Sequence, residues 1–235
     1  MNIEEYKKTR ELSRRHFWYR QRERIIRFFM NKYSSACHSV LDTGCGTCPD
    51  MHIADNAIGM DMNINALKLC SRENLTVNAD MLYMPFKLES FDIVWAMDVL
   101  QSNDINEEKA LMGINRIIKP GGYFFINVPA YPSLYSAHDI GVNNARRYTR
   151  VQLKRLLSNY FDVLELHYWN FILMPAVIFK RKQIGIFSST SNSDLRQIPK
   201  GLNSILNIIM IFEFALFKLN LLPAGVSIFT ICRKR

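Results

Sequence analysis

The chain has 235 residues, of which 49% are hydrophobic and 22% are charged, and its formal net charge is +9 at pH 7. This length suits one α/β domain with a packed core and is too short for two domains of ordinary size, and the composition excludes a disordered chain. The positive charge favours an anionic partner, such as nucleic acid, acidic lipid headgroups or a phosphorylated substrate, but a solvated basic surface would have the same composition.

Residues 1–33 are predicted to form a helix. Phe17, Ile25, Phe28 and Phe29 recur at the spacing of one helix face, and Arg and Lys side chains occupy most of the other positions. The sequence therefore predicts an amphipathic N-terminal helix that packs on the rest of the domain.

Residues 40–61 contain two apolar runs that end in acids, Asp42 and Asp61, with Gly44 and Gly46 directly after the first run. This order is typical of two parallel strands of a nucleotide-binding α/β unit. Glycine lets the backbone turn sharply and approach a ligand closely. Asp61, at the carboxyl end of the second strand, is placed to accept hydrogen bonds from ribose hydroxyls. The sequence therefore predicts a nucleoside ligand.

The five cysteines are irregularly spaced, and no apolar signal sequence stands at the start. Both observations predict a reducing, cytoplasmic setting. The pair Cys45-x-x-Cys48 follows a predicted strand, as a redox motif would, whereas a zinc site would need a second pair of soft ligands. Because glycines flank Cys45, a nucleoside-binding loop is the preferred interpretation.

The run Asp42-Thr43-Gly44-Cys45-Gly46-Thr47 resembles the S-adenosylmethionine-binding motif of class I methyltransferases, Asp-x-Gly-x-Gly-x-Gly. Cys48 stands where the third glycine of that motif usually is. A dinucleotide-binding Gly-x-Gly-x-x-Gly fits less well, because it would want glycine or alanine at Pro49.

The resemblance implies a set of cofactor contacts. Residues 76–81 would be a third strand, with Asp80 and Met81 beside the adenine, although a loop Asp that caps a turn is the simpler alternative. Tyr19 and Arg22 would lie over the cofactor carboxylate, or would only anchor their helix. Together the residues implied to bind cofactor are Asp42, Gly44, Cys45, Gly46, Asp61, Met62, Asp80, Met81, Met97, Asp98, Tyr19 and Arg22.

Two later stretches strengthen the resemblance. Residues 91–100 are similar to the fourth strand of the family and place Asp98 at its end, and residues 115–129 read as a helix, a Pro-Gly-Gly turn and a fifth strand. Many relatives have Glu-His after the fourth strand, where this chain has Gln101-Ser102. Some relatives use an acid there to hold magnesium, so no metal is expected.

Residues 129–153 are similar to a bacterial subgroup associated with glycan or secondary-metabolite modification. The resemblance implies substrate contacts at Tyr135, Asp139, Arg146, Arg147 and Tyr148. Where the subgroup has Gly-His before the two arginines, this chain has Asn144-Ala145. His138 is the candidate general base, because the reference pKa of histidine, about 6.5, suits proton removal near neutrality. A histidine that only hydrogen-bonds a loop is the alternative.

The sixth strand is expected at 161–169 and the last strand at 226–232. The connection between them, residues 170–223, is longer than the fold requires. It contains a basic cluster at 180–182, a polar loop at 188–194 and an apolar helix over 202–219. Three interpretations of this helix compete. A lid or a homodimer contact is preferred, and peripheral contact with a membrane is the alternative. A spanning helix is disfavoured because Glu213 lies near its middle.

Taken together, the chain is expected to be a single methyltransferase domain with a doubly wound, seven-stranded, Rossmann-like α/β sheet and an antiparallel last strand. Residues 1–36 would form an N-terminal helical segment, 37–169 the cofactor-binding core, 170–224 an insertion between strands six and seven, and 225–235 the last strand.

The expected activity is methyl transfer from S-adenosylmethionine to an oxygen, nitrogen or carbon of a small-molecule or glycan-like acceptor. Nucleic acid is not the expected acceptor, because no dedicated RNA-binding domain and no Asn/Asp-Pro-Pro-Tyr motif is found. Two alternatives stay open. One is a non-catalytic S-adenosylmethionine-binding module, because Cys48, Gln101 and Asn144 depart from the family pattern. The other is a methyltransferase that acts on a lipid-linked acceptor at the membrane surface.

Overall fold

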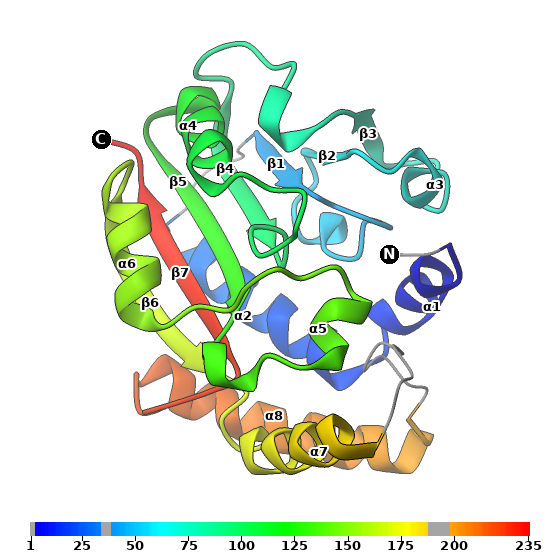
Figure 1. The fold of residues 1–235 in the computed structure, drawn as a ribbon. Helices are drawn as coiled ribbons and strands as arrows, with labels where there is room; N and C mark the ends of the chain where they lie inside the picture. Colours follow the sequence, from blue (N-terminus) through cyan, green and yellow to red (C-terminus); the bar gives the residue numbers. More distant parts are fainter. Residues whose placement is uncertain (1–2, 34–38, 188–197) are drawn as a thin grey trace.

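The computed structural model of the protein describes residues 3–33, 39–187 and 198–235, which fold into one seven-stranded sheet with helices on both faces (Figure 1). The strand order is β3-β2-β1-β4-β5-β7-β6, and only β7 runs antiparallel to its neighbours. The doubly wound sheet with an antiparallel last strand is therefore confirmed. The strands are β1 Val40–Thr43, β2 Ala57–Asp61, β3 Leu75–Asn78, β4 Phe91–Met97, β5 Ile118–Pro129, β6 Asp162–Trp169 and β7 Ser227–Arg233.

Eight α-helices are described. They are α1 Ile3–Ser13, α2 Phe17–Tyr33, α3 Ile64–Leu67, α4 Glu107–Ile117, α5 Ala137–Gly141, α6 Arg150–Ser158, α7 Met174–Phe187 and α8 Lys200–Lys218. Side chains cap the starts of two of these helices: the Asn63 side chain accepts from the backbone of α3, and the Thr149 side chain accepts from the backbone of α6.

Two apolar layers enclose the sheet. On one face α4 and α6 contribute buried side chains such as Ile114 and Leu157, and on the other face α2 and α8 contribute Phe29 and Phe217. The central strand β4 is buried on both sides, which explains why its sequence is a nearly continuous apolar run.

The N-terminal segment consists of two helices, so the expectation of one helix over residues 1–33 is wrong. The chain turns between Ser13 and Phe17, and Asn203 of α8 holds that turn. The Asn203 side chain accepts from the Phe17 N–H at 3.0 Å and donates to the Arg15 carbonyl at 2.8 Å. A residue almost two hundred positions away thus supplies the partners that a continuous helix would have supplied itself.

Two further boundaries differ from the sequence-based expectation. Strand β3 ends at Asn78 rather than reaching residue 81, because Asp80 starts a short 3₁₀ helix by accepting from the Leu82 N–H at 2.8 Å. The insertion contains the unpredicted helix α7, which carries the whole basic cluster at 180–182. The predicted polar loop at 188–194 lies outside the described residues.

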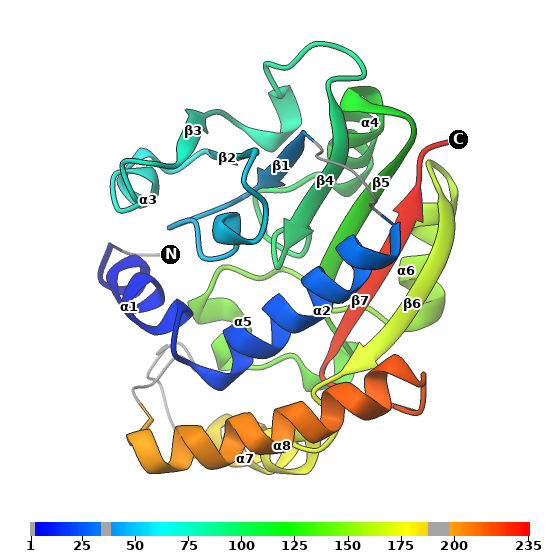
Figure 2. The same cartoon turned by 180° about the vertical axis from the view of Figure 1, so that it is seen from behind.

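The insertion helices α7 and α8 both lie beyond the carboxyl ends of the parallel strands, at one end of the molecule (Figures 1 and 2). Glu213 ties α8 to the end of β6. Its carboxylate is fully buried and accepts from the Asn170 N–H at 2.6 Å and the Ile172 N–H at 2.9 Å. The acid that argued against a spanning helix therefore fixes α8 to the domain.

Candidate active site

A cavity of about 890 Å³ opens at the carboxyl ends of β1, β2 and β4, between the sheet, α1, α2 and the insertion. Most of the predicted site residues contribute to its wall. These are Tyr19, Arg22, Gly44, Cys45, Gly46, Asp61, Met62, Met81, Met97, Asp98, His138 and Arg147. Residues from the whole length of the predicted core and from the predicted substrate segment are thus brought to one cavity.

The loop after β1 has the backbone conformation that the glycines predict. Gly44 and Gly46 have φ values of +72° and +54°, which favour glycine. A Cβ at Gly44 would lie 2.5 Å from a Val99 methyl group, whereas a Cβ at Gly46 would have only Tyr6, at 3.8 Å, within 4 Å. The open side of Gly46 faces the cavity, so a ligand can approach the backbone there.

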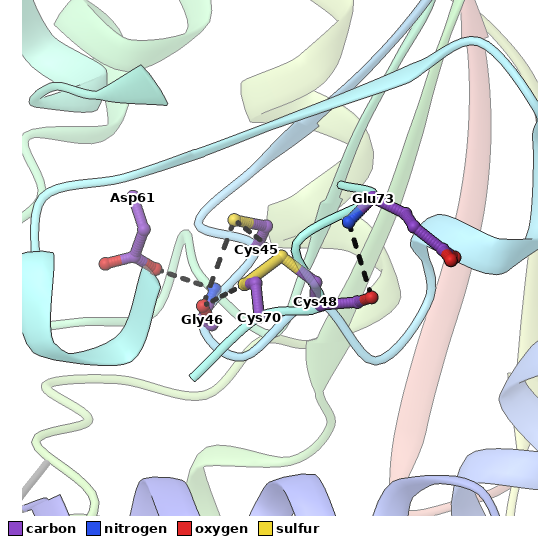
Figure 3. The surroundings of a disulfide bond; sticks show 7 residues. Cys45, Gly46, Cys48, Asp61, Cys70 and Glu73 are labelled. Carbon is purple, nitrogen blue, oxygen red and sulfur yellow. Dashed lines mark hydrogen bonds between the residues drawn. A yellow bond between two sulfur atoms is a disulfide. The ribbon is translucent and has the colours of Figure 1, made fainter. Parts of the chain in front are cut away.

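Cys48, which stands in place of the third glycine of the motif, keeps the backbone conformation of the loop and adds a covalent bond. Its φ is +61°, so the backbone keeps the left-handed conformation that glycine would adopt most easily. Cys48 also forms a disulfide with Cys70, with their Cα atoms 5.5 Å apart (Figure 3). The bridge joins the loop after β1 to the segment after α3.

The Cys45-x-x-Cys48 pair is not a bridged redox pair, since Cys45 keeps a buried thiol 3.9 Å from the Cys48 sulfur. Burial raises the pKa of the Cys45 thiol, and the carboxylates of Asp42 and Asp61 raise it further. Within the part of the chain that the structure describes, no group of three or more His, Cys, Asp or Glu side chains could hold a metal ion.

Asp61 lies at the end of β2 and fixes the loop at the predicted ribose site (Figure 3). One carboxylate oxygen accepts from the Gly46 N–H and the other from the Asn63 N–H, each at 2.8 Å. Burial raises the pKa of Asp61, although both N–H donors oppose the shift. Each oxygen still has a lone pair for a further donor.

Arg22 is buried among acids at the floor of the cavity. Its guanidinium donates to Asp50 at 2.5 Å and to Asp98 at 2.9 Å, and it stacks on the rings of Trp18 and Tyr19. Burial would lower the pKa of Arg22, but Asp50 and Asp98 hold it above its usual value. Both terminal nitrogens thus contact protein carboxylates, and the predicted contact with a cofactor carboxylate stays a prediction.

The acids around Arg22 outnumber the positive charge. Burial raises the pKa of Asp98, although Arg22 and Asn127 oppose the shift, and it raises the pKa of Asp42 to about 8, with Asp50 adding to the effect. A buried cluster with an excess of carboxylates favours a cationic ligand.

Two predicted cofactor contacts lie outside the cavity wall. Asp42 is buried within β1, and the Asp80 side chain caps the turn that starts with Met81, as the simpler alternative had it. Their predicted contacts with cofactor stay predictions.

The predicted substrate segment divides into cavity residues and supporting residues. His138 and Arg147 line the cavity, but Tyr135, Asp139, Arg146 and Tyr148 do not. The supporting side chains bond to the protein: Tyr135 to the Asn144 carbonyl, and Arg146 and Tyr148 both to Glu107. Substrate contacts for these four residues stay predictions.

Asp139 organises this segment from within. It is fully buried, and it forms ion pairs with Arg147 at 2.8 Å and with Arg181 of α7 at 3.0 Å. Burial would raise the pKa of Asp139, but Arg147 and Arg181 hold it below its usual range. The carboxylate therefore joins the substrate segment to the insertion.

The sequence did not predict several of the residues that line the cavity. They come from α1, from the loops after β4 and α5, and from the insertion: Tyr6, Thr9, Gln101, Asn144, Asn170, Leu173, Val177 and Ile198. Gln101 and Asn144 were noted only as departures from the family pattern. The insertion contributes through α7, the segment before α7 and Ile198 ahead of α8, so α7 rather than α8 closes the cavity.

The comparisons with known proteins agree with this geometry. Residues 41–126 match a family model described as "Methyltransferase domain". The uncharacterised protein MJ1252 of Methanocaldococcus jannaschii is 35% identical over 92 residues, which are 38% of this chain and 36% of that protein. A tRNA (carboxymethyluridine(34)-5-O)-methyltransferase of Arabidopsis thaliana is 31% identical over 94 residues, which are 38% of this chain and 23% of that protein. The chain thus spans less than half of the length of these curated relatives.

A solved structure of a SAM-dependent methyltransferase from Thermotoga maritima has a TM-score of 0.62 at 16% identity, covering 99% of this chain and 96% of that chain. At this identity the likeness shows the fold. Residues 41–126 thus match a methyltransferase domain, and the whole chain shares the fold of the Thermotoga maritima methyltransferase, with the strand order β3-β2-β1-β4-β5-β7-β6.

Proposed function

We propose that the protein transfers the methyl group of S-adenosylmethionine to a small-molecule acceptor bound in the same cavity. The observation that carries this proposal is the continuity of the cavity. It runs from the loop at Gly46 and Asp61, where a nucleoside fits, to His138 and Asn144 at its other side. About 890 Å³ is near the upper end of the usual range for small-molecule pockets, so the volume suits two ligands.

The residues present fit this cofactor. Gly46 leaves open the space that a Cβ would fill, and Asp61 presents a carboxylate to the ribose position. The excess of carboxylates around Arg22 suits a ligand that carries an ammonium and a sulfonium group.

When bound, S-adenosylmethionine supplies a methyl group on a cationic sulfur, which a nucleophile displaces in line. The task of the protein is therefore to align the two reactants and exclude water. Asp61 would orient the ribose, and the rings of Trp18 and Tyr19 close the cavity on the side of α2. His138 would accept the proton of an acceptor hydroxyl, whereas an amine or thiolate would need less help.

The wall on the acceptor side is mixed in character. Asn144, Gln101 and His138 offer polar groups, while Leu173, Val177 and Ile198 of the insertion offer an apolar surface. This combination supports an acceptor with a polar reactive end and an apolar part. A glycan-like headgroup on an apolar carrier has that character. The lipid-linked acceptor, an alternative from the sequence analysis, therefore stays open. A cytoplasmic location is part of the proposal.

Asp61 provides the test of cofactor binding. Asp61→Ala should weaken the binding of S-adenosylmethionine by about 3 kcal/mol, or about a hundredfold, because hydrogen bonds to a charged acceptor are lost at about 1.5–3 kcal/mol each. Isothermal titration calorimetry measures the affinity, and circular dichroism checks that the loop held by Asp61 still folds. Replacing the exposed Asp55 with Ala is the matched control. An affinity within about threefold of wild type would contradict the ribose contact.

Turnover must be tested separately. Release of S-adenosylhomocysteine in a screen of hydroxyl, amine and carbon acceptors distinguishes an enzyme from a protein that only binds the cofactor. Binding without product from any acceptor would support the non-catalytic alternative.

A further inference from the structure

The helix α8 presents an apolar face that nothing in the described structure covers. This face consists of Ile205, Ile208, Ile211, Phe212 and Leu219, which are between 52% and 68% exposed. Their spacing places them along one side of the helix. The opposite side, with Met210, Glu213 and Phe217, is buried against the domain. An exposed apolar strip of this length marks an interaction surface.

Helix α8 packs against the rest of the domain. By its length of 19 residues and its mean hydropathy of 1.4, α8 is the one described helix that could cross a membrane. Crossing would pull the buried Glu213 away from the backbone N–H groups of Asn170 and Ile172 and expose the face that packs on α2. A helix that keeps these contacts can only lie along a surface.

Basic side chains border the apolar face. Helix α2 runs beside α8, and its Arg24 donates to Asn207 of α8 at 2.8 Å. Arg20 and Arg27 stand one turn to either side of Arg24, and both are exposed. Lys200 and Lys218 are exposed at the two ends of α8. Glu23 is the one acid among these positions of α2, and it already pairs with Arg27 at 2.9 Å.

We propose that this apolar face and its basic border dock the protein on the surface of an anionic lipid bilayer. The apolar side chains would enter the boundary between headgroups and acyl chains, and the arginines and lysines would contact the headgroups. A second copy is the weaker occupant. A two-fold contact through this face would bring the arginine rows of both copies to one interface, where like charges repel.

The docking has a consequence that rests on the proposed function. Leu173 just before α7, Val177 of α7 and Ile198 before α8 line the cavity at the same end of the molecule. An acceptor held in the bilayer by an apolar chain would approach the cavity from this end. The docking itself needs no methyl transfer and is tested without it.

Co-sedimentation with lipid vesicles tests the proposal on the full chain. We expect binding to phosphatidylcholine vesicles that contain about 30% phosphatidylglycerol, and weaker binding as salt is raised from about 50 to about 500 mM. The substitutions Ile208→Glu and Phe212→Glu together should weaken binding at least about tenfold, because they place charges at the centre of the apolar face. Each Gln replacement among Arg20, Arg24 and Arg27 should weaken it by about fivefold, the equivalent of about 1 kcal/mol.

The matched control is Leu88→Glu with Met112→Glu, which makes the same change at exposed apolar positions away from α8 and should bind like wild type. Circular dichroism checks the folding of each variant, and Phe212→Ser replaces the double variant if that one does not fold. The proposal fails if wild type stays in the supernatant with every vesicle, or if the face variant binds as wild type does. It also fails if the face substitutions abolish a dimer seen by analytical ultracentrifugation without changing vesicle binding, or if the protein in cell membranes resists extraction with alkaline carbonate.

Discussion

At the scale of single residues, the floor of the cavity is an unbalanced charge cluster. Arg22 is the one described cation in contact with Asp50 and Asp98. The pKa of Asp42 is affected by the charges of Asp50 and Arg22. Such a cluster costs the folded protein stability unless one carboxyl stays protonated or a cation binds. Stability and cofactor binding are therefore coupled through these acids.

Asp42 makes the coupling measurable. Its pKa is raised from 3.8 to about 8 in the folded state, so the folded protein binds a proton that the unfolded chain releases. The contribution of this group to stability is present below about pH 4 and is lost as pH rises to about 8. Asp42→Asn removes this loss. Its free energy of unfolding in urea should therefore rise relative to wild type between pH 4 and pH 8 and level off above. The exposed control Asp55→Asn should show no such trend.

His138 is the residue whose role depends on the acceptor. His138→Ala should lower turnover of a hydroxyl acceptor about a hundredfold or more, because general base catalysis contributes about 10²–10⁴ in rate. The affinity for S-adenosylmethionine should not change. A variant with normal turnover on the true acceptor would assign His138 a structural role.

At the scale of elements, the insertion determines how the N-terminal helices and the cavity are arranged. Asn203 of α8 holds the turn between α1 and α2, and Arg181 of α7 pairs with Asp139 in the substrate segment. The helices α1 and α7, both placed by these contacts, supply Tyr6, Thr9 and Val177 to the cavity, and Leu173 lies directly before α7. The insertion is therefore part of the site rather than an appendage.

Glu213 is the contact that attaches the insertion to the sheet. Glu213→Gln should lower the free energy of unfolding by about 1–3 kcal/mol, because the amide group keeps one acceptor oxygen and turns a donor toward the second backbone N–H. Chemical denaturation measures the loss. Replacing the exposed Glu108 with Gln should leave stability within about 0.5 kcal/mol of wild type. An equal loss in both variants would show that the buried contacts of Glu213 do not matter.

At the scale of the whole molecule, formation of the disulfide depends on whether the compartment of the protein is oxidising or reducing. The bridge between Cys48 and Cys70 closes a ring of the chain that contains Asp61. Asp61 in turn accepts a hydrogen bond from the Gly46 N–H, just outside the ring. The cytoplasmic location expected from the irregular cysteines would keep both residues as thiols, because disulfides persist mainly in oxidising compartments. The close approach of the two sulfurs is a finding of the tertiary structure that the spacing of the cysteines does not reveal.

The contribution of the bridge can be measured directly. In the purified, oxidised protein, Cys48→Ser with Cys70→Ser should lower stability by about 3 kcal/mol, from the closure of a ring of some twenty residues. For a chain of this size the loss corresponds to about 6–12 °C in melting temperature. Addition of a reductant should lower the wild-type melting temperature to that of the variant. If wild type and variant melt together without reductant, the bridge does not form.

The sequence by itself determined the sheet and the glycine loop, and its resemblance to a known family predicted the cofactor class. Apolar runs, closely spaced glycines and acids at the ends of apolar runs are local features, and local features can be seen in a sequence without an alignment. For the same reason Asp61, Asp98 and His138 could be placed near the site, since the carboxyl ends of parallel strands meet at one edge of a sheet.

Only the tertiary structure decided which side chains face the cavity and which hold its walls. Asp139, Tyr148 and Arg146 look like substrate contacts in the sequence, but each bonds to a residue from another element. The break at residues 14–16, the disulfide and the wall formed by α7 likewise depend on partners distant along the chain. Burial and pairing are properties of the packed molecule, because they are set by neighbours that the sequence order does not place together.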